Sequence, residues 1–278
     1  MVWGHPLQRG RKQPGRIKIM FINSIVKTNA PLPEQDAYLR KIPAISGLSR
    51  LDLNCPVTFL VGENGSGKST LLEAVAVAFG FNPEGGSRNF HFSTEDTHSA
   101  LSQLLCLYKG PYRPKDGFFL RAESFYNAAS EVDRLSKNNL YGSSPDKSYL
   151  QNFGGKSLHQ QSHGESFLAL VLNRFWGNGL YLLDEPEAAL SPARQLTLLS
   201  EIHRLVKKNS QLLIATHSPI LMAYPDAEIL LLSDGPIRPV AYEDTEHYQI
   251  TKSFLENPQR MLRILLEEEP AEGAALSD

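Results

Sequence analysis

A run of nine residues, from Gly62 to Thr70, carries the clearest chemical signal in this sequence. It reads GENGSGKST and fits the pattern GxxxxGK[ST] of loops that hold nucleotide phosphates. Its glycines allow the backbone to turn N–H groups around an anion, and a helix that starts there adds partial positive charge. Lys68 is expected to reach the β- and γ-phosphates of ATP, and the Ser69 hydroxyl is expected to bind Mg²⁺. The predicted phosphate-binding residues are Gly62, Asn64, Gly65, Ser66, Gly67, Lys68, Ser69 and Thr70.

The segments on either side of this loop support the same prediction. Residues 57–61 (VTFLV) form an apolar run typical of a buried strand, and residues 70–79 have the apolar content and length of a helix. A glycine-rich turn that matches the pattern by chance is the alternative. A strand before the loop and a helix after it are the context that phosphate loops require, so the nucleotide interpretation is favoured.

Two adjacent carboxylates give a second signal. Asp184 and Glu185 directly follow the apolar run 180–183, which predicts another buried strand. Because the carboxyl ends of parallel strands face the nucleotide crevice, Asp184 is expected near the Mg²⁺ held by Ser69. Glu185 is expected to orient or deprotonate an attacking water. The alternative is a strand end with acidic residues that serve solubility alone, which the preceding phosphate loop disfavours.

A histidine follows a third apolar run. Residues 211–215 (QLLIA) predict a buried strand, and His217 lies just beyond it in the sequence Thr-His-Ser-Pro. A neutral imidazole at this edge of the sheet could form a hydrogen bond with the γ-phosphate or with the attacking water. A purely structural histidine is the alternative.

The rest of the chain predicts helices, strands and loops but offers no further catalytic motif. Residues 17–26 predict a first strand, 97–108 a short helix, and 117–122 another strand. Apolar residues at helical spacing predict a helix over 125–135. The segment 136–161 is rich in Ser, Asn, Gly, Lys and Gln, and predicts a mobile loop.

Composition excludes several classes of protein. A formal net charge of −2 over 278 residues argues against a globally basic nucleic-acid binder. Cys55 and Cys106 show neither metal-ligand spacing nor a disulfide framework, which favours the reducing cytoplasm. No apolar run approaches the length of a membrane span, so no membrane insertion is expected. A local basic cluster keeps a nucleic-acid contact open, although a solvated loop explains its residues equally well: Arg88, Lys109, Arg113, Lys115 and Arg121.

Together these motifs resemble the ABC-type ATPase family, in the soluble branch that includes SMC-like and RecF-like ATPases. Residues 62–69 resemble its Walker A motif, residues 180–185 its Walker B motif, and His217 its switch histidine. Residues 161–166 (QSHGES) are similar to its signature motif, with Ser162, Gly164 and Glu165 in register. Gln161 and His163 depart from the usual leucine and glycine, and in the D-loop-like segment 189–192 Ser191 replaces the common aspartate. The resemblance extends over residues 17–235.

The resemblance implies a P-loop NTPase fold of the ABC-ATPase type, an α/β fold with a mainly parallel central sheet flanked by helices and a small inserted lid or helical subdomain. The expected layout is a basic flexible tail over 1–16, one ATPase domain over 17–267 with an inserted region at about 83–161, and an acidic flexible tail over 268–278. Gln103 and Glu123 are candidates for the Q-loop residue, and Tyr38 for an adenine-stacking residue.

The resemblance also implies a function. It predicts Mg²⁺-dependent ATP hydrolysis, with Lys68, Glu185 and His217 as catalytic residues and Ser69 and Asp184 as metal ligands. In such proteins the signature of one subunit closes over the ATP of the other, so Ser162, Gly164 and Glu165 would act in a homodimer. The process driven would involve a nucleic acid or a partner protein. The nucleotide-binding subunit of a membrane transporter and an ATP-gated interaction module with little turnover are the alternatives.

Overall fold

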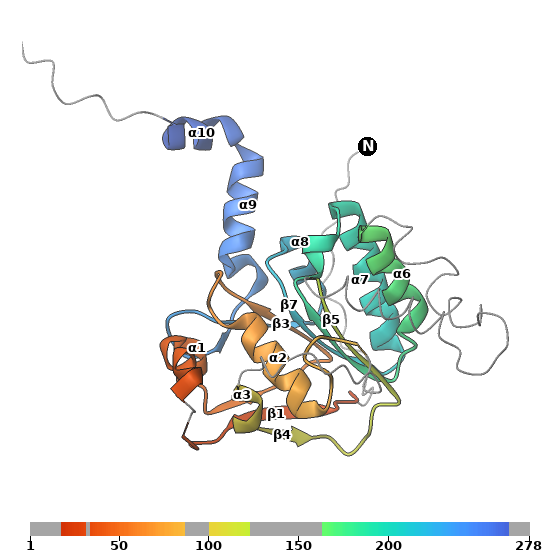
Figure 1. Ribbon diagram of the computed structural model, residues 1–278. Helices are drawn as coiled ribbons and strands as arrows, with labels where there is room; N and C mark the ends of the chain where they lie inside the picture. The colour runs from red at the N-terminus through yellow and green to blue at the C-terminus, as the bar shows by residue number, and fades with distance from the viewer. Residues whose placement is uncertain (1–17, 32–33, 87–99, 123–162, 267–278) are drawn as a thin grey trace, which may run out of the picture.

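The computed structural model describes residues 18–31, 34–86, 100–122 and 163–266. Its ribbon is shown in Figure 1. The predicted helix 125–135, the predicted loop 136–161 and both predicted tails lie outside these ranges.

A six-stranded sheet forms the centre of the molecule, in the order β5-β6-β7-β3-β8-β9. The first five strands run parallel and β9 pairs antiparallel with β8, which confirms the predicted mainly parallel sheet. Their inner strands are nearly continuous apolar runs because both faces of the sheet are covered. The strands are β5 (Asp116–Arg121), β6 (Gly179–Asp184), β7 (Gln211–Ala215), β3 (Val57–Val61), β8 (Glu228–Leu231) and β9 (Arg238–Pro239).

The register of the parallel strands brings three strand ends to one edge. Asp184, the last residue of β6, is paired with Ala215, the last residue of β7, and Ala215 is paired with Leu60 of β3. The residues that follow these strands therefore meet at the same edge, as expected for the carboxyl ends of a parallel sheet.

A smaller antiparallel sheet packs beside the central one, in the order β2-β1-β4. It consists of β1 (Ile22–Lys27), β2 (Arg50–Asp52) and β4 (Leu105–Lys109). The predicted first strand at 17–26 therefore lies a few residues further along. The predicted helix at 97–108 is wrong over its second half: α3 (Leu101–Leu104) is one turn long, and the chain then pairs with β1 as a strand. Pairing with β1, a distant segment of the chain, overrides the local tendency to form a helix.

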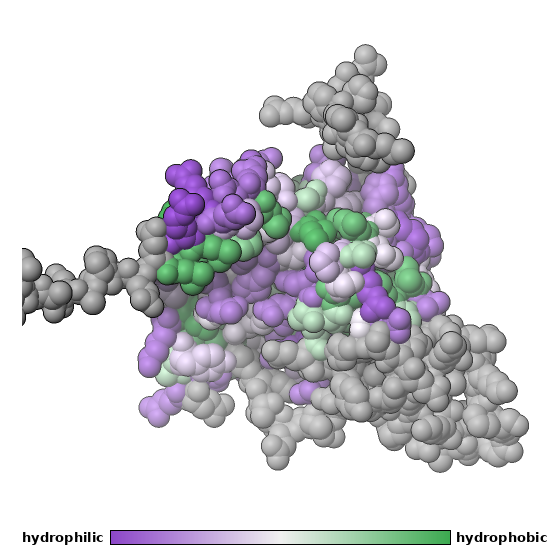
Figure 2. Space-filling view, turned by 90° about the horizontal axis from the view of Figure 1, so that it is seen from above, coloured by the Kyte–Doolittle hydropathy of each residue, from purple (hydrophilic) through white to green (hydrophobic). Residues whose placement is uncertain are grey.

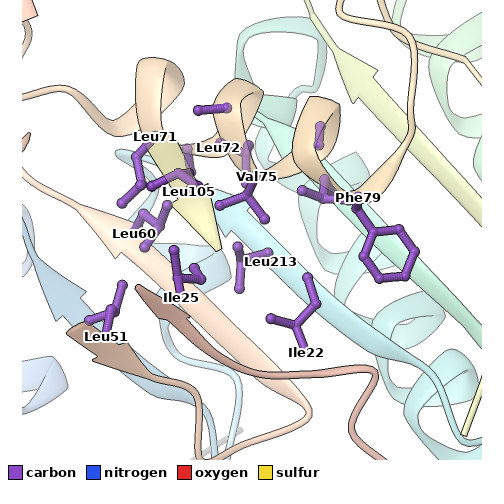
Figure 3. Close-up of a cluster of buried hydrophobic side chains, with 14 of the residues drawn as sticks. Ile22, Ile25, Leu51, Leu60, Leu71, Leu72, Val75, Phe79, Leu105 and Leu213 are labelled. Atoms are coloured by element: carbon purple, nitrogen blue, oxygen red, sulfur yellow. The ribbon is translucent and has the colours of Figure 1, made fainter. Parts of the chain in front are cut away.

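Helices cover both faces of the central sheet (Figure 1). Helix α2 (Lys68–Phe79) lies between the two sheets, where its apolar side chains meet both (Figure 3). Helices α6 (His163–Arg174), α7 (Pro192–Lys207) and α8 (Pro219–Met222) pack on the opposite face. Phe59 and Leu60, consecutive in β3, point to the two different cores, as the alternation of a strand requires.

One buried amide joins the two sheets. The Gln211 side chain, at the start of β7 and fully buried, accepts hydrogen bonds from the backbone N–H groups of Phe21 and Ile22 at 2.8 and 2.9 Å. Its own amide group donates to the Ile22 carbonyl at 2.9 Å. The backbone that leads into β1 thus has its polar groups satisfied by the neighbouring sheet.

The predicted inserted region at 83–161 needs a correction over its described part. Strand β4 belongs to the smaller sheet and β5 to the central sheet, so residues 105–121 are part of the main fold. The apolar residues Phe118, Phe119 and Leu120 are buried beside β6, and this burial explains why the segment joins the sheet. Short helical segments fill the connections: η1 (Glu34–Lys41), α1 (Pro43–Ser46), η3 (Pro186–Ala189) and η4 (Tyr242–Asp244).

Two C-terminal helices, α9 (Glu246–Glu256) and α10 (Pro258–Leu266), extend away from the rest of the molecule (Figure 1). Helix α10 leaves Leu262 and Leu265 exposed. Figure 2 shows exposed hydrophobic residues on the molecule's surface as seen from above. Among the helices that the structure describes, none has both the length and the apolar character needed to cross a membrane.

Candidate active site

The phosphate-loop residues form the connection between β3 and α2. Gly62, Gly65 and Gly67 have φ values of 146°, 82° and 95°, in the region that favours glycine. A side chain at Gly62 would meet the Leu232 carbonyl oxygen at 2.1 Å, so a larger residue cannot be accommodated there. Asn64 is exposed in the turn, and the helix begins directly after Gly67. The loop N–H groups and the start of α2 thus lie at one end of the sheet, as anion binding requires.

The Lys68 ammonium group lies inside this loop. Lys68 is 4% exposed, and its Nζ donates hydrogen bonds to the carbonyl oxygens of Gly62 and Glu63, each at 2.9 Å. Burial lowers the pKa of Lys68, and the nearby carboxylates of Glu185 and Asp184 oppose this shift. A cation is therefore held by the backbone at the position where the sequence predicts a phosphate contact.

Ser69 and Asp184 come from different elements and meet directly. The Ser69 hydroxyl, in the first turn of α2, donates a hydrogen bond of 2.8 Å to Oδ1 of Asp184, at the end of β6. Asp184 is 5% exposed. A hydroxyl and a carboxylate are oxygen donors, the type that Mg²⁺ prefers. Close by, the Ser66 hydroxyl oxygen is buried without a hydrogen-bond partner, so it is available to a phosphate oxygen.

Arg121 lies beside the candidate site, although its place in the sequence grouped it with a surface cluster of basic residues. It ends β5, in register with Asp184, and its Nε lies 3.4 Å from Oδ2 of that carboxylate. Its guanidinium also donates to Glu73 of α2 at 2.8 Å. The side chain is 20% exposed, so Arg121 is turned toward these acids rather than presented with the basic cluster of the sequence analysis. In the sequence, only its position at the end of a predicted strand could have indicated that Arg121 lies near Asp184.

Glu185 lies where the chain leaves the sheet. Its φ of 48° is unusual for a residue other than glycine, and its backbone N–H donates to the Ala215 carbonyl at 2.9 Å. This conformation turns the chain from β6 into η3. The carboxylate remains 37% exposed, and its Oε1 lies 3.5 Å from Nε2 of His217. The two groups that the sequence predicts to handle water are thus adjacent.

His217 makes further contacts that the sequence did not predict. Its Nδ1 lies 2.8 Å from Nε2 of His247 in α9, and its backbone N–H donates to Oε1 of Glu187. Burial and the Lys68 charge lower the pKa of His217, which favours the neutral imidazole. Burial raises the pKa of the Glu187 carboxyl. Glu187 stands two residues after Glu185 and could have been suspected, whereas no pattern around His247 marks it.

Two of the three signature residues can be placed. Gly164, in the first turn of α6, packs so tightly that a Cβ there would lie 2.5 Å from the Ala189 carbonyl oxygen. Glu165 forms an ion pair of 2.9 Å with Arg194 of α7. Ser162 lies outside the described residues, as does Glu123.

Other predicted residues are not brought into the site by any contact that the structure shows. Gln103 is exposed in α3, and Tyr38 is 48% exposed in η1. Ser191 precedes the first turn of α7 as its N-cap residue. Thr70 lies in α2, one residue after Ser69.

The parallel sheet, the glycine-bearing loop and the helix that follows it define a P-loop protein. Two family models match the sequence: "AAA domain" over residues 39–133, and "AAA domain, putative AbiEii toxin, Type IV TA system" over residues 154–223. Each match covers less than half of the chain, and the two matches cover different parts of it.

Curated relatives include ATP-binding proteins of transport systems. An uncharacterized ABC transporter ATP-binding protein of Haemophilus influenzae is 27% identical over 62% of this chain and 68% of its own. The hemin import ATP-binding protein HmuV of Rhodopseudomonas palustris is 26% identical, covering 70% of this chain and 79% of its own. The thiamine import ATP-binding protein ThiQ of a Ruegeria species is 27% identical, with 73% and 85% covered.

Solved structures with a similar outline include a nucleotide-free ATP-binding cassette from an ABC transporter, 18% identical, with a TM-score of 0.46 and coverage of 90% of this chain and 100% of that one. The SMC head domain from Thermotoga maritima is 17% identical, with a TM-score of 0.45 and coverage of 80% and 100%. The two family matches and the curated relatives support an ABC-type P-loop ATPase.

Proposed function

We propose that this protein hydrolyses ATP with Mg²⁺ at the site formed by Lys68, Ser69, Asp184, Glu185 and His217. The observation that carries the proposal is the hydrogen bond of 2.8 Å from Ser69 to Asp184, beside the buried Lys68 ammonium. It joins the phosphate loop to the carboxylate end of β6, which is the arrangement that ATP and its metal need.

The donor set fits magnesium. Ser69 and Asp184 would hold the ion, and the phosphates of the substrate would supply further oxygen ligands. When bound, Mg²⁺ would neutralise negative charge on the phosphates and stabilise the negative charge that develops on the leaving ADP. Ser66, whose buried hydroxyl oxygen has no partner, would donate to a phosphate oxygen.

Each side chain of the site would have its own role in the reaction. Lys68 would exchange its two carbonyl contacts for oxygens of the β- and γ-phosphates, where its charge stabilises the transition state. Glu185 would accept a proton from water as the oxygen of that water attacks the γ-phosphorus. The bond from phosphorus to the β,γ-bridging oxygen breaks, and ADP and phosphate leave. The neutral His217 would donate from Nε2 to the γ-phosphate or to the water.

A second copy of the chain would complete the site. In this proposal the start of α6, with Gly164 and Glu165, faces the γ-phosphate bound by the partner in a head-to-tail dimer. Ser162, which precedes the helix in the sequence, is proposed to contact the same phosphate. The tight packing of Gly164 against Ala189 supports it, because this contact ties the signature helix to the segment that follows Glu185. A structural change beside the nucleotide of one copy would therefore be transmitted through this contact to the nucleotide site of the other copy.

The process driven by hydrolysis has two candidates. We favour action on a nucleic acid or a partner protein in the cytoplasm, because the signature departs from the family pattern at Gln161 and His163. The names of the curated relatives favour a second candidate, the nucleotide-binding subunit of an import transporter. Co-purification with an integral membrane protein would select the second candidate. Stimulation of the ATPase rate by DNA or RNA would select the first.

Glu185→Gln tests the catalytic core, with Glu256→Gln on the exposed α9 as the matched control. We expect Glu185→Gln to bind Mg·ATP but to lose turnover by about 100-fold or more, because a positioned general base contributes on that order. Its mass by light scattering should double with Mg·ATP. Near-normal turnover would remove the assignment of the base. A monomer that still binds ATP would show that the signature does not close on a second copy.

A further inference from the structure

The contact between His217 and His247 adds a residue to the site that none of the motifs includes. His247 is the second residue of α9, beyond both family matches. Its Nε2 lies 2.8 Å from Nδ1 of His217, and the two rings meet edge to face with centroids 4.9 Å apart. Two imidazole nitrogens at this distance share one proton, so one must donate and the other accept.

The first turn of α9 is held in place, which fixes His247. The Tyr242 hydroxyl donates to the Pro219 carbonyl of α8 at 3.0 Å, and the Tyr242 ring packs against Tyr248 with centroids 4.6 Å apart. Thr245, the buried residue before the helix, donates from its hydroxyl to the Tyr242 carbonyl at 2.7 Å. His247 therefore reaches His217 from an anchored element rather than from a free helix end.

The other side of the His217 ring decides the direction of this hydrogen bond. Nε2 faces Oε1 of Glu185 at 3.5 Å, and an ionised carboxylate can only accept. Nε2 must therefore carry the proton if it is to interact favourably with Glu185 or with a phosphate oxygen. In a neutral imidazole the other nitrogen, Nδ1, is then an acceptor.

We propose that His247 is a positioning residue, which donates its Nε2–H to Nδ1 of His217 and so keeps the proton of the neutral His217 on Nε2, directed at Glu185 and the nucleotide. Without His247 the ring of His217 can rotate or change tautomer, and its donor is no longer aimed. The C-terminal helix thereby becomes part of the ATPase site. This inference rests on the proposed function in one respect, the role of His217 in hydrolysis.

The first test needs no nucleotide. In protein labelled with ¹⁵N in its histidine rings, nuclear magnetic resonance above the His217 pKa should show Nδ1 of His217 unprotonated and Nε2 protonated. The Nδ1 resonance should shift in His247→Leu and return toward its original position in His247→Gln, whose amide N–H can replace the donor. A protonated Nδ1 of His217 in the wild type would overturn the proposal.

The second test separates positioning from a general structural effect. His247→Leu should lower kcat by about 10- to 100-fold, with KM for ATP nearly unchanged. This loss is smaller than the roughly 10²- to 10⁴-fold contribution of an acid–base group itself, because His247 only positions His217. His247→Gln should recover most of the rate. In a His217→Ala background, His247→Leu should cause no further loss, because both changes remove the same interaction.

The matched control is His203→Leu, an exposed histidine of α7 that contacts Tyr224 instead, and it should retain wild-type kcat. If His247→Leu does not fold, His247→Ala and His247→Gln carry the same comparison. An equal loss from His247→Leu with and without His217 would overturn the proposal. Absence of ATPase activity in the wild type would instead refute the proposed function, and the resonance of Nδ1 would still decide this inference.

Discussion

The amide of Gln211 offers a sharp test of how the two sheets are joined. We consider Gln211→Met, which keeps the length of the side chain but removes its donor and acceptor. The change leaves two N–H groups, of Phe21 and Ile22, and the Ile22 carbonyl without their side-chain partner. Phe21 and Ile22 are almost fully buried, so water cannot readily replace the amide.

The expected cost follows from these three groups. A buried polar group left unsatisfied costs about 1–3 kcal/mol, so the three together cost about 3–9 kcal/mol. A thioether buried in place of an amide returns about 1–2 kcal/mol. The free energy of unfolding should therefore fall by about 1–8 kcal/mol. A typical protein has a free energy of unfolding of only about 5–15 kcal/mol.

Urea denaturation followed by circular dichroism measures this loss, and the melting temperature should drop by at least about 2 °C. The control is Gln259→Met on the exposed face of α10, which should leave the free energy of unfolding within about 0.5 kcal/mol of wild type. A loss at Gln211 no larger than that of the control would refute the reasoning, because it would mean that the amide does not satisfy the backbone of β1.

Three further changes test other parts of the site. Lys68→Ala should abolish measurable ATP binding in calorimetry, because it removes the cation from the phosphate loop; wild-type affinity would contradict its role. Gly164→Ala should reduce the free energy of unfolding by about 1–3 kcal/mol in urea denaturation, because the added Cβ would lie 2.5 Å from the Ala189 carbonyl oxygen; an unchanged midpoint would contradict this packing. Glu187→Gln should be more stable than wild type at pH 8, because burial raises the pKa of the Glu187 carboxyl. The folded wild type takes up a proton as the pH falls through that raised value toward the unfolded pKa of about 4.3, so wild type should gain on the variant over this range in urea titrations; a difference independent of pH would contradict the shift.

Local patterns were enough to predict much of this protein. The strand at 57–61, the loop that ends in Lys68 and the apolar strand before Asp184 are each encoded by consecutive residues, and the structure has them where the sequence predicts them. A parallel sheet buried on both faces requires nearly continuous apolar strands, which made the fold class visible in the sequence.

Elements whose state depends on distant partners were less predictable. The predicted helix over 97–108 is wrong from residue 105 on, because residues 105–109 form β4, for which β1 offers a strand partner across the fold. β5 was assigned to the predicted inserted region, but for the same reason it pairs with β6 in the central sheet of the structure.

The sequence by itself determined the residue types of the nucleotide loop, the carboxylates after β6 and the histidine after β7, because each follows its own strand within a few positions. Only the tertiary structure decided which other side chains meet them. Arg121 reaches Asp184 through strand order, and His247 reaches His217 because α9 is anchored on α8. Such contacts join residues 30 or more positions apart, and nothing in the local pattern of either partner specifies them.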